Sequence, residues 1–351
     1  MQSEHRRTGA SNQLGVSCSI QANWLSSKDM LGVRVLPVHV DRRIHLAFLN
    51  ANAMNHMSFP NTWLQPDWPA IDGVQALFTS RHGGVSQAPF DTMNLGDHVH
   101  DRHEDVQRNR QMLTDLIRQS SPNASPVFLR QVHGCGVLKQ GMESQHGSEA
   151  DACVTNTPGA VCTIMVADCL PVLFAHQGTG VVGAAHAGWR GLAGVDGTGV
   201  LEETFAQFAA LVHSEQAQGA IQNEVSSVVS LQASSAVTSA LSVAADTQVW
   251  LGPCIGPKAF EVGNEVRDAF CAVNAENEVC FEPGQTAGKW WANLPLLARH
   301  RLGAMGISRI YGNDGSDVWC TVTQESLYFS HRRDAGRLGS TGRMAACIWK
   351  E

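Results

Sequence analysis

Residues 161–191 read VCTIMVADCLPVLFAHQGTGVVGAAHAGWRG, and this stretch sets the expected architecture. Its two continuous apolar runs, VCTIMVADC and VVGAAH, are typical of strands buried on both faces of a sheet. The first run ends at Cys169 and the second at His186, while His133 follows a shorter apolar stretch in LRQVHG. We therefore expect an α/β protein with these three side chains at strand ends, where a rigid scaffold can carry a functional site.

The composition indicates a folded protein that does not bind nucleic acid. The 351 residues suffice for one large domain or two modest ones, and 43% hydrophobic against 16% charged residues allow a sizeable core. The formal net charge of −7 argues against a protein that neutralises nucleic-acid phosphates. A small anionic substrate remains compatible with this charge, because it needs only a local basic pocket.

Two further features predict a cytoplasmic protein that does not bind a membrane. No apolar run is long enough to cross a bilayer, and residues 1–20 lack the apolar core of a secretory signal. The ten cysteines form no C-x-x-C pair, which in a chain of this length favours reduced thiols over a disulfide framework.

Strands and helices are expected to alternate along most of the chain. Apolar runs predict strands at 74–79 and 344–349, in addition to the two central ones. Helical periodicity predicts helices at 103–119, 199–213, 261–273 and 291–306.

Two segments differ from this pattern. Residues 1–56 have weak periodicity, and we expect them to be a poorly ordered extension, with the natural start closer to Met54 or Met57. Residues 57–351 are expected to form one catalytic domain. Within it, the low-complexity stretch at about 214–247 reads as a surface insertion that could be helix or loop.

The combination of His133, Cys169 and His186 predicts a metal site. One thiolate and two imidazoles suit Zn²⁺, and three protein ligands leave a fourth position open for water or substrate. Each residue alone is more often a core histidine or a small buried cysteine, so the prediction rests on their shared placement. Asp168, beside Cys169, is the candidate for orienting a ligand or a substrate proton.

Three alternatives compete with this interpretation. Cys169 and His186 could instead form the nucleophile pair of a cysteine hydrolase, which would not need His133. A second histidine cluster, GDHVHDRHED, lies in a polar stretch and is interpreted as a solvated turn. A protein without catalytic activity, acting only by interaction, is disfavoured because several Gly- and Arg-containing turns accompany the candidate metal ligands.

Four glycine-rich turns stand out: RHGGVS (81–86), HAGWRG (186–191), LGPCIGP (251–257) and TGRMA (341–345). None matches a Walker loop or a dinucleotide-binding fingerprint. Arg81, Arg190 and Arg343 lie in or beside three of them, and an arginine next to exposed backbone N–H groups can bind an anion.

The order of motifs along the chain strongly resembles the YfiH family, also called the laccase-domain, polyphenol-oxidoreductase-like or peptidoglycan editing factor family. The resemblance extends from about Trp63 to Trp349 and rests on these motifs: SRHGGVSQAPFDTMNLGDHV, LRQVHG, ADACVT, CTIMVADCLPVLFAH, HAGWRGLAGV, WLGPCIGPKAFEVGNEVRDAF, KWWANLPLLARHRL and FSHRRDAGRLGSTGRMAACIW. It implies a single α/β (α+β) domain of mixed β-sheets packed between helices.

The resemblance also implies an activity and a cofactor. It implies one zinc ion held by His133, Cys169 and His186, and phosphorolysis of purine nucleosides such as adenosine and inosine to the free base and ribose 1-phosphate. Adenosine deaminase activity is implied as a further possibility. The alternative function is an amide hydrolase acting on a peptidoglycan precursor through Cys169 and His186.

The candidates for contacts with the nucleoside or phosphate are Arg81, Asn94, Arg190 and Arg333. Copper is disfavoured relative to zinc, because a multicopper oxidase needs many further histidine ligands. The one H-x-H pair, His98 and His100, is remote from the Cys169 motif in the sequence.

Deletion of residues 1–53 is expected to leave both activity and melting temperature nearly unchanged, because this segment has none of the patterns from which the domain is predicted. Thermal unfolding and an activity assay on the truncated chain test this. A large loss of either property contradicts the prediction.

Overall fold

The computed structural model describes residues 60–223 and 236–351 of the chain. The predicted extension, residues 1–56, and the middle of the predicted insertion therefore lie outside the described residues. Within the described ranges, no helix has the length and apolar character needed to cross a membrane.

The larger of two main sheets has six strands in the order β12-β8-β6-β7-β4-β3. At its centre, β6 (Leu170–His176) pairs antiparallel with β7 (Val182–Ala187), with Pro171 opposite His186. Strand β6 also pairs antiparallel with β8, and β7 pairs antiparallel with β4. The edge strands β12 and β3 run parallel to their neighbours β8 and β4. The remaining strands are β3 (Val137–Lys139), β4 (Ala152–Thr155), β8 (Thr247–Leu251) and β12 (Arg309–Gly312).

The second main sheet has four strands in the order β1-β13-β5-β2. It combines two antiparallel pairings with one parallel pairing, between β2 and β5. Its strands are β1 (Val74–Phe78), β2 (Ser125–Phe128), β5 (Ala160–Val166) and β13 (Met344–Lys350). A small third sheet contains β9 (Glu261–Gly263), β10 (Phe281–Pro283) and β11 (Lys289–Ala292).

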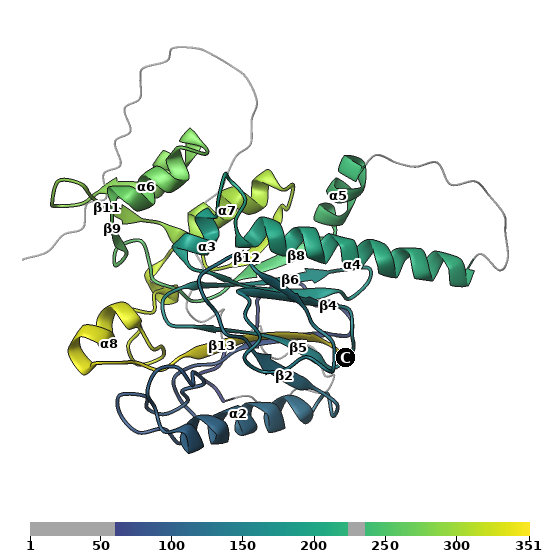
Figure 1. Cartoon of the computed structure of the whole chain (residues 1–351), viewed down its shortest axis with the longest axis horizontal. Helices are drawn as coiled ribbons and strands as arrows, with labels where there is room; N and C mark the ends of the chain where they lie inside the picture. The colour runs from purple at the N-terminus through teal and green to yellow at the C-terminus, as the bar shows by residue number, and fades with distance from the viewer. Residues whose placement is uncertain (1–59, 224–235) are drawn as a thin grey trace, which may run out of the picture. The chain divides into compact units, whose positions relative to one another are not determined.

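The two main sheets pack face to face, and a helix covers the outer face of each (Figure 1). Along β6, Leu173 and Ala175 face the four-stranded sheet, whereas Val172 and Phe174 face helix α4 (Val200–Asn223). Because both faces are buried, every residue of β5, β6 and β7 is buried. This explains the continuous apolar runs, and the predicted domain of mixed sheets between helices is confirmed.

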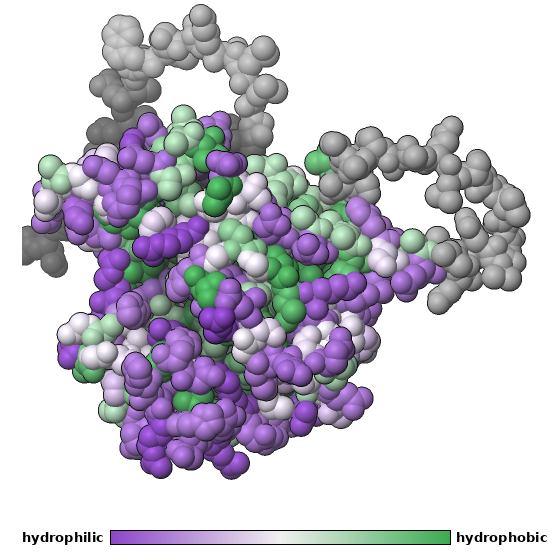
Figure 2. All heavy atoms as spheres, in the orientation of Figure 1, coloured by the Kyte–Doolittle hydropathy of each residue, from purple (hydrophilic) through white to green (hydrophobic). Residues whose placement is uncertain are grey.

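Helix α2 (His103–Arg118) covers the four-stranded sheet and α4 (Val200–Asn223) covers the six-stranded one. The outward face of α2 is mostly hydrophilic (Figure 2), as expected for an amphipathic helix. The other helices are α3 (Trp189–Ala193), α5 (Ala236–Ala245), α6 (Asn264–Cys271), α7 (Leu294–Ala304) and α8 (His331–Leu338), with 3₁₀ turns η3 (Ala275–Cys280) and η4 (Asp317–Trp319).

The predicted helices differ from the observed ones mainly at their starts. Strand β9 occupies residues 261–263, and the end of β11 occupies residues 291–292. Helix α6 therefore starts only after Gly263, and α7 only after Asn293. The Asn293 side chain accepts a hydrogen bond from Leu296 N and so caps α7. In the predicted insertion, residues 214–223 continue α4 and residues 236–245 form α5.

Replacing Trp349 with alanine is expected to destabilise the fold by about 3–5 kcal/mol, as is typical for a buried tryptophan. Trp349 is fully buried between β13 and the α2 side, and its Nε1 donates to Ser121 Oγ at 2.8 Å. The control Ser121→Ala removes that hydrogen bond and the longer one from Ser121 Oγ to Glu351 Oε1, at 3.4 Å, and is expected to cost about 1 kcal/mol. Urea denaturation measures both, and equal losses would contradict the packing argument.

Candidate metal centre

Three segments that are separate in the sequence bring His133, Cys169 and His186 together. His133 lies in the loop between β2 and β3, Cys169 directly precedes β6, and His186 lies near the end of β7. Cys169 Sγ is 3.7 Å from His133 Nε2, and the two imidazole rings lie edge to face with centroids 4.7 Å apart. One ligand atom from each residue lies within 4.8 Å of the others, so the cluster could hold a metal ion.

The spacing of these donor atoms fits a tetrahedral ion of the size of Zn²⁺. Zn–S and Zn–N bonds of ordinary length at a tetrahedral angle separate sulfur from nitrogen by about 3.6 Å, and the observed separation is 3.7 Å. His186 is buried, Cys169 is half-buried and His133 is exposed, so one side of the cluster is open. Within the described ranges, no other group of three such ligand residues has suitable spacing.

Asp151 connects two of the three candidate ligands and was not identified from the sequence. Its Oδ1 accepts hydrogen bonds from His186 Nδ1 and from the His133 backbone N–H, both at 2.8 Å. Its Oδ2 accepts from the N–H groups of Gly134, at 2.7 Å, and Val132, at 3.2 Å. Because Nδ1 of His186 is engaged, its Nε2 remains free to bind a metal.

The fully buried Asp151 carboxylate is stabilised as an anion by these donors. Burial raises the pKa of Asp151, but the hydrogen bonds from His186 and the Gly134 N–H outweigh burial, so the net pKa is lowered. The sequence signal was a lone carboxylate directly before the buried strand in ADACVT. That signal does not predict which side chain donates a hydrogen bond to the carboxylate.

Cys169 and His186 favour a thiolate and an imidazolium in the absence of a metal. Burial raises the pKa of Cys169, but the charge of His186 and hydrogen bonds from both histidines lower it to about 6. Burial lowers the pKa of His186, but the charge of Cys169 and the hydrogen bond to Asp151 raise it to about 9. The thiolate is the form of cysteine that binds metals and acts as a nucleophile.

Asp168 lies beside the cluster but its carboxylate has other partners. Thr321 Oγ1 and the Arg332 backbone N–H each donate to it at 2.6 Å, so it fixes the first turn of α8 against the β5–β6 connection. Asp168 itself has φ of 88°, a left-handed conformation that turns the chain sharply before Cys169. No described hydrogen bond joins Asp168 to either histidine ligand.

Gly188 leaves the space in which two candidate ligands meet. A Cβ at this position would lie 2.9 Å from His133 Cδ2 and 3.1 Å from Cys169 Sγ. The glycine of the AHAGWRG motif therefore permits the close approach of the three ligand-bearing segments.

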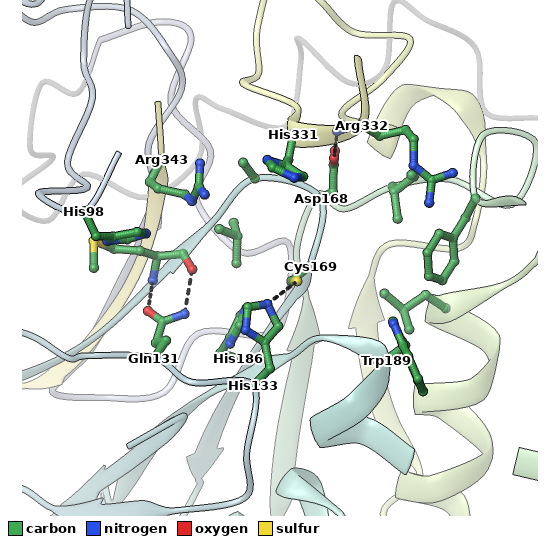
Figure 3. Close-up of a pocket in the computed structure, with 16 residues that line it drawn as sticks. His98, Gln131, His133, Asp168, Cys169, His186, Trp189, His331, Arg332 and Arg343 are labelled. Carbon is green, nitrogen blue, oxygen red and sulfur yellow. Dashed lines mark hydrogen bonds between the residues drawn. The ribbon is translucent and has the colours of Figure 1, made fainter. Parts of the chain in front are cut away.

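A cavity of about 380 Å³ opens over the cluster (Figure 3). Its volume lies in the range of small-molecule sites. It is lined by His98, Gln131, His133, Met165, Val166, Ala167, Asp168, Cys169, His186, Trp189, Ile255, Phe260, Leu294, His331, Arg332 and Arg343.

The four predicted substrate contacts are not among the residues that line this cavity. Arg81 binds Asp91 and two backbone carbonyls, and Arg333 binds Asp334 and three backbone carbonyls. Asn94 is buried, and the Arg190 guanidinium lies 4.4 Å from the Trp189 ring centroid. Their roles as substrate contacts stay predictions.

The histidine-rich stretch contributes one residue to the cavity, His98, although we interpreted the stretch as a solvated turn. Burial lowers the pKa of His98, and the charge of Arg343 lowers it further. His331 and Arg332, which were not predicted from the sequence, also line the cavity.

Comparison with known proteins gives consistent matches over the described domain. The family described as "Multi-copper polyphenol oxidoreductase laccase" matches residues 75–227 and 224–351. A purine nucleoside phosphorylase of Pseudomonas aeruginosa is 41% identical over 290 residues, covering 82% of this chain and 98% of that protein. The purine nucleoside phosphorylase YfiH of Escherichia coli is 41% identical over 284 residues, covering 81% and 97%.

A solved structure agrees with these matches. The crystal structure of a Neisseria meningitidis protein is 37% identical to this chain, with a TM-score of 0.65. The alignment covers 83% of this chain and 99% of that protein.

Replacing Asp151 with asparagine is expected to lower zinc affinity roughly 10–100-fold, as is typical when the hydrogen-bond partner of a metal-binding histidine is removed. The asparagine amide keeps the shape but cannot serve as acceptor for all four N–H donors. Competition with a chromogenic chelator measures the affinity. The matched control, Asp334→Asn, alters another buried carboxylate, which pairs with Arg333 and Arg337 and has no contact to the histidines. An equal loss there would contradict this role of Asp151.

Proposed function

This chain belongs to the YfiH family of laccase-domain proteins, and from that premise we propose that it is a zinc-dependent purine nucleoside phosphorylase. The observation that carries the proposal is the 41% identity with relatives named purine nucleoside phosphorylase, over nearly the full length of those relatives. We further propose residues 57–351 as the catalytic domain, with residues 1–56 as an extension and about 214–247 as an insertion.

The chemical character of the cavity supports a nucleoside and phosphate as substrates. Trp189 and Phe260 line it together with Ile255 and offer apolar surface against which a purine base can stack. Arg332 and Arg343 also line it and can bind anionic oxygens.

In the proposed reaction, a phosphate oxygen forms a bond to C1′ of the ribose while the C1′–N9 bond breaks. The electron pair of that bond leaves with the base, which gains the proton that phosphate loses. The products are the free base and ribose 1-phosphate. Since positive charge develops at C1′, an anion held next to this carbon is the main requirement.

We propose that His133, Cys169 and His186 hold the metal and that Asp151 orients His186. When bound, zinc would supply Lewis-acid polarisation of a phosphate or ribose oxygen. Asp168 holds the turn that presents Cys169, through its hydrogen bonds to Thr321 and the start of α8. Zinc is favoured over copper because the described ranges contain one ligand cluster, whereas a multicopper oxidase needs several.

Incubation of the zinc-loaded protein with adenosine or inosine, with and without phosphate, tests this function. We expect phosphate-dependent release of free base and formation of ribose 1-phosphate. The same mixtures test the adenosine deaminase activity implied by the family resemblance, since deamination releases ammonia. Base release that does not depend on phosphate, or no base release at all, contradicts the proposal.

Replacing Cys169 with alanine is expected to abolish both zinc binding and turnover, because it removes the thiolate ligand. Metal analysis and the base-release assay measure the two effects on the same sample. Cys347→Ala is a suitable control, since Cys347 is a fully buried cysteine of β13 outside the cavity lining. Full activity of the Cys169 variant without zinc would refute the metal-dependent mechanism.

A chelator distinguishes the cysteine hydrolase alternative. Removal of zinc should inactivate a phosphorylase of this kind, and added zinc should restore it. A hydrolase using Cys169 and His186 alone should keep its activity after chelation and lose it on alkylation of the thiol.

A further inference from the structure

Arg343 is an arginine of the cavity wall that no carboxylate neutralises. It belongs to the TGRMA turn and directly precedes β13. Within residues 60–223 and 236–351, no acidic side chain lies within ion-pair distance of its guanidinium. Its Nη1 donates to the Thr341 and Gly342 carbonyl oxygens, each at 3.1 Å. Its Nε and Nη2 have no described acceptor and are available to a ligand.

The position of Arg343 is fixed by buried neighbours. The Asn94 side chain is fully buried, and its Oδ1 accepts hydrogen bonds from the backbone N–H groups of both Arg343 and Gly96, each at 2.9 Å. A Cβ on Gly96 would lie 2.8 Å from Arg343 Cγ and 3.4 Å from His98 Cε1. The loop around Asn94 therefore packs against the arginine stem and holds the guanidinium in advance of binding, which reduces the entropy lost when a ligand binds.

Two histidines of the cavity wall accompany Arg343. Figure 3 shows Arg343 and His98 on one side of Cys169, Trp189 with Arg332 on the other, and His331 above Cys169. His98 Nδ1 lies 3.6 Å from Asp97 Oδ1, and burial and the charge of Arg343 lower the pKa of His98, so its neutral imidazole can share a hydrogen bond with an anion while Arg343 supplies the positive charge. This side of the cavity thus combines free donors with positive potential.

Asp168 is the carboxylate that lines this cavity, and it does not occupy the free donors of Arg343. Both of its oxygens already accept short hydrogen bonds, from Thr321 and the Arg332 N–H. Arg332 resembles Arg343 in that only its Nη1 has described acceptors, the Ala259 and Glu261 carbonyl oxygens. It differs in location, because its guanidinium lies 5.6 Å from the Phe260 ring centroid, on the aromatic side of the cavity.

We propose that Arg343, together with His98 and His331, forms the binding subsite for the phosphate co-substrate. The nucleoside then occupies the opposite, aromatic side near Trp189, with the candidate metal ligands between the two substrates. This inference rests on the proposed function, since it assigns one of the two substrates of that reaction. It differs from the sequence-based prediction, in which Arg81, Asn94, Arg190 and Arg333 contact the substrates. Asn94 acts here through Arg343 and is a positioning residue.

The test is titration of the full-length, zinc-loaded protein with inorganic phosphate, followed by calorimetry. Replacing Arg343 with methionine removes the charge and keeps much of the side-chain volume. We expect the phosphate Kd to rise roughly tenfold or more, since a charge-assisted hydrogen bond contributes on that scale. The matched control is Arg108→Met, an exposed arginine of α2 outside the cavity lining, for which the Kd should not change.

Steady-state kinetics add a readout that a merely structural role would not change. Arg343→Met should raise KM for phosphate roughly tenfold or more and leave KM for the nucleoside within about threefold. Arg343→Lys keeps the positive charge and should recover part of the phosphate affinity. If the methionine variant does not fold, Arg343→Gln, which also removes the charge, takes its place.

The outcomes separate the two proposals. Unchanged phosphate affinity in Arg343→Met or, for a methionine variant that does not fold, in Arg343→Gln overturns the subsite. A loss in Arg108→Met comparable to that of the Arg343 variant overturns it as well. If the wild-type protein binds phosphate through Arg343 but releases no base from nucleosides, the subsite stands and the phosphorylase function fails. If base release requires phosphate but Arg343→Met leaves KM for phosphate unchanged, the function stands and the subsite fails.

Discussion

The buried carboxylate of Asp151 is the interaction on which the arrangement of the site depends. It accepts hydrogen bonds from four nitrogen donors, three of them backbone N–H groups of residues 132–134 and the fourth on the His186 ring. A buried anion without such donors would be strongly unfavourable. Because three of the donors belong to the loop that carries His133 and the fourth to His186 of β7, the carboxylate holds this loop against β7. Asp151 thereby links a loop to a central strand and fixes which nitrogen of His186 faces the cavity.

The sandwich of two sheets places the cluster where loops from distant parts of the chain converge. Cys169 lies on the connection by which the chain passes from the four-stranded sheet to the six-stranded one, between β5 and β6. The antiparallel pairing of β6 with β7 then places His186 next to that connection. The cavity wall is completed by the loop before α2 and by the starts of α8 and β13. The paired strands β6 and β7 thus position Cys169 and His186, while loops carry His133 and most of the cavity wall.

The local sequence patterns predicted elements well where packing agrees with periodicity. Helix α2 and strands β1 and β13 lie within one or two residues of their predicted bounds, because each buries one consistent set of apolar side chains. At 261–273 and 291–306 the same patterns predicted helices that start too early. The first residues of these segments pair instead with one another in a small sheet, and such a pairing depends on a strand elsewhere in the chain.

The sequence by itself determined the buried strands, the amphipathic helices and the identity of the three candidate metal ligands, because these follow from residue type and local spacing. Only the tertiary structure decided which polar side chains lie at the site. Asp151 rather than Asp168 contacts the histidines, and Arg332 and Arg343, rather than the four predicted contacts, line the cavity. The physical reason is that the partners of a carboxylate or a guanidinium come from segments far away in the sequence, so long-range packing selects them.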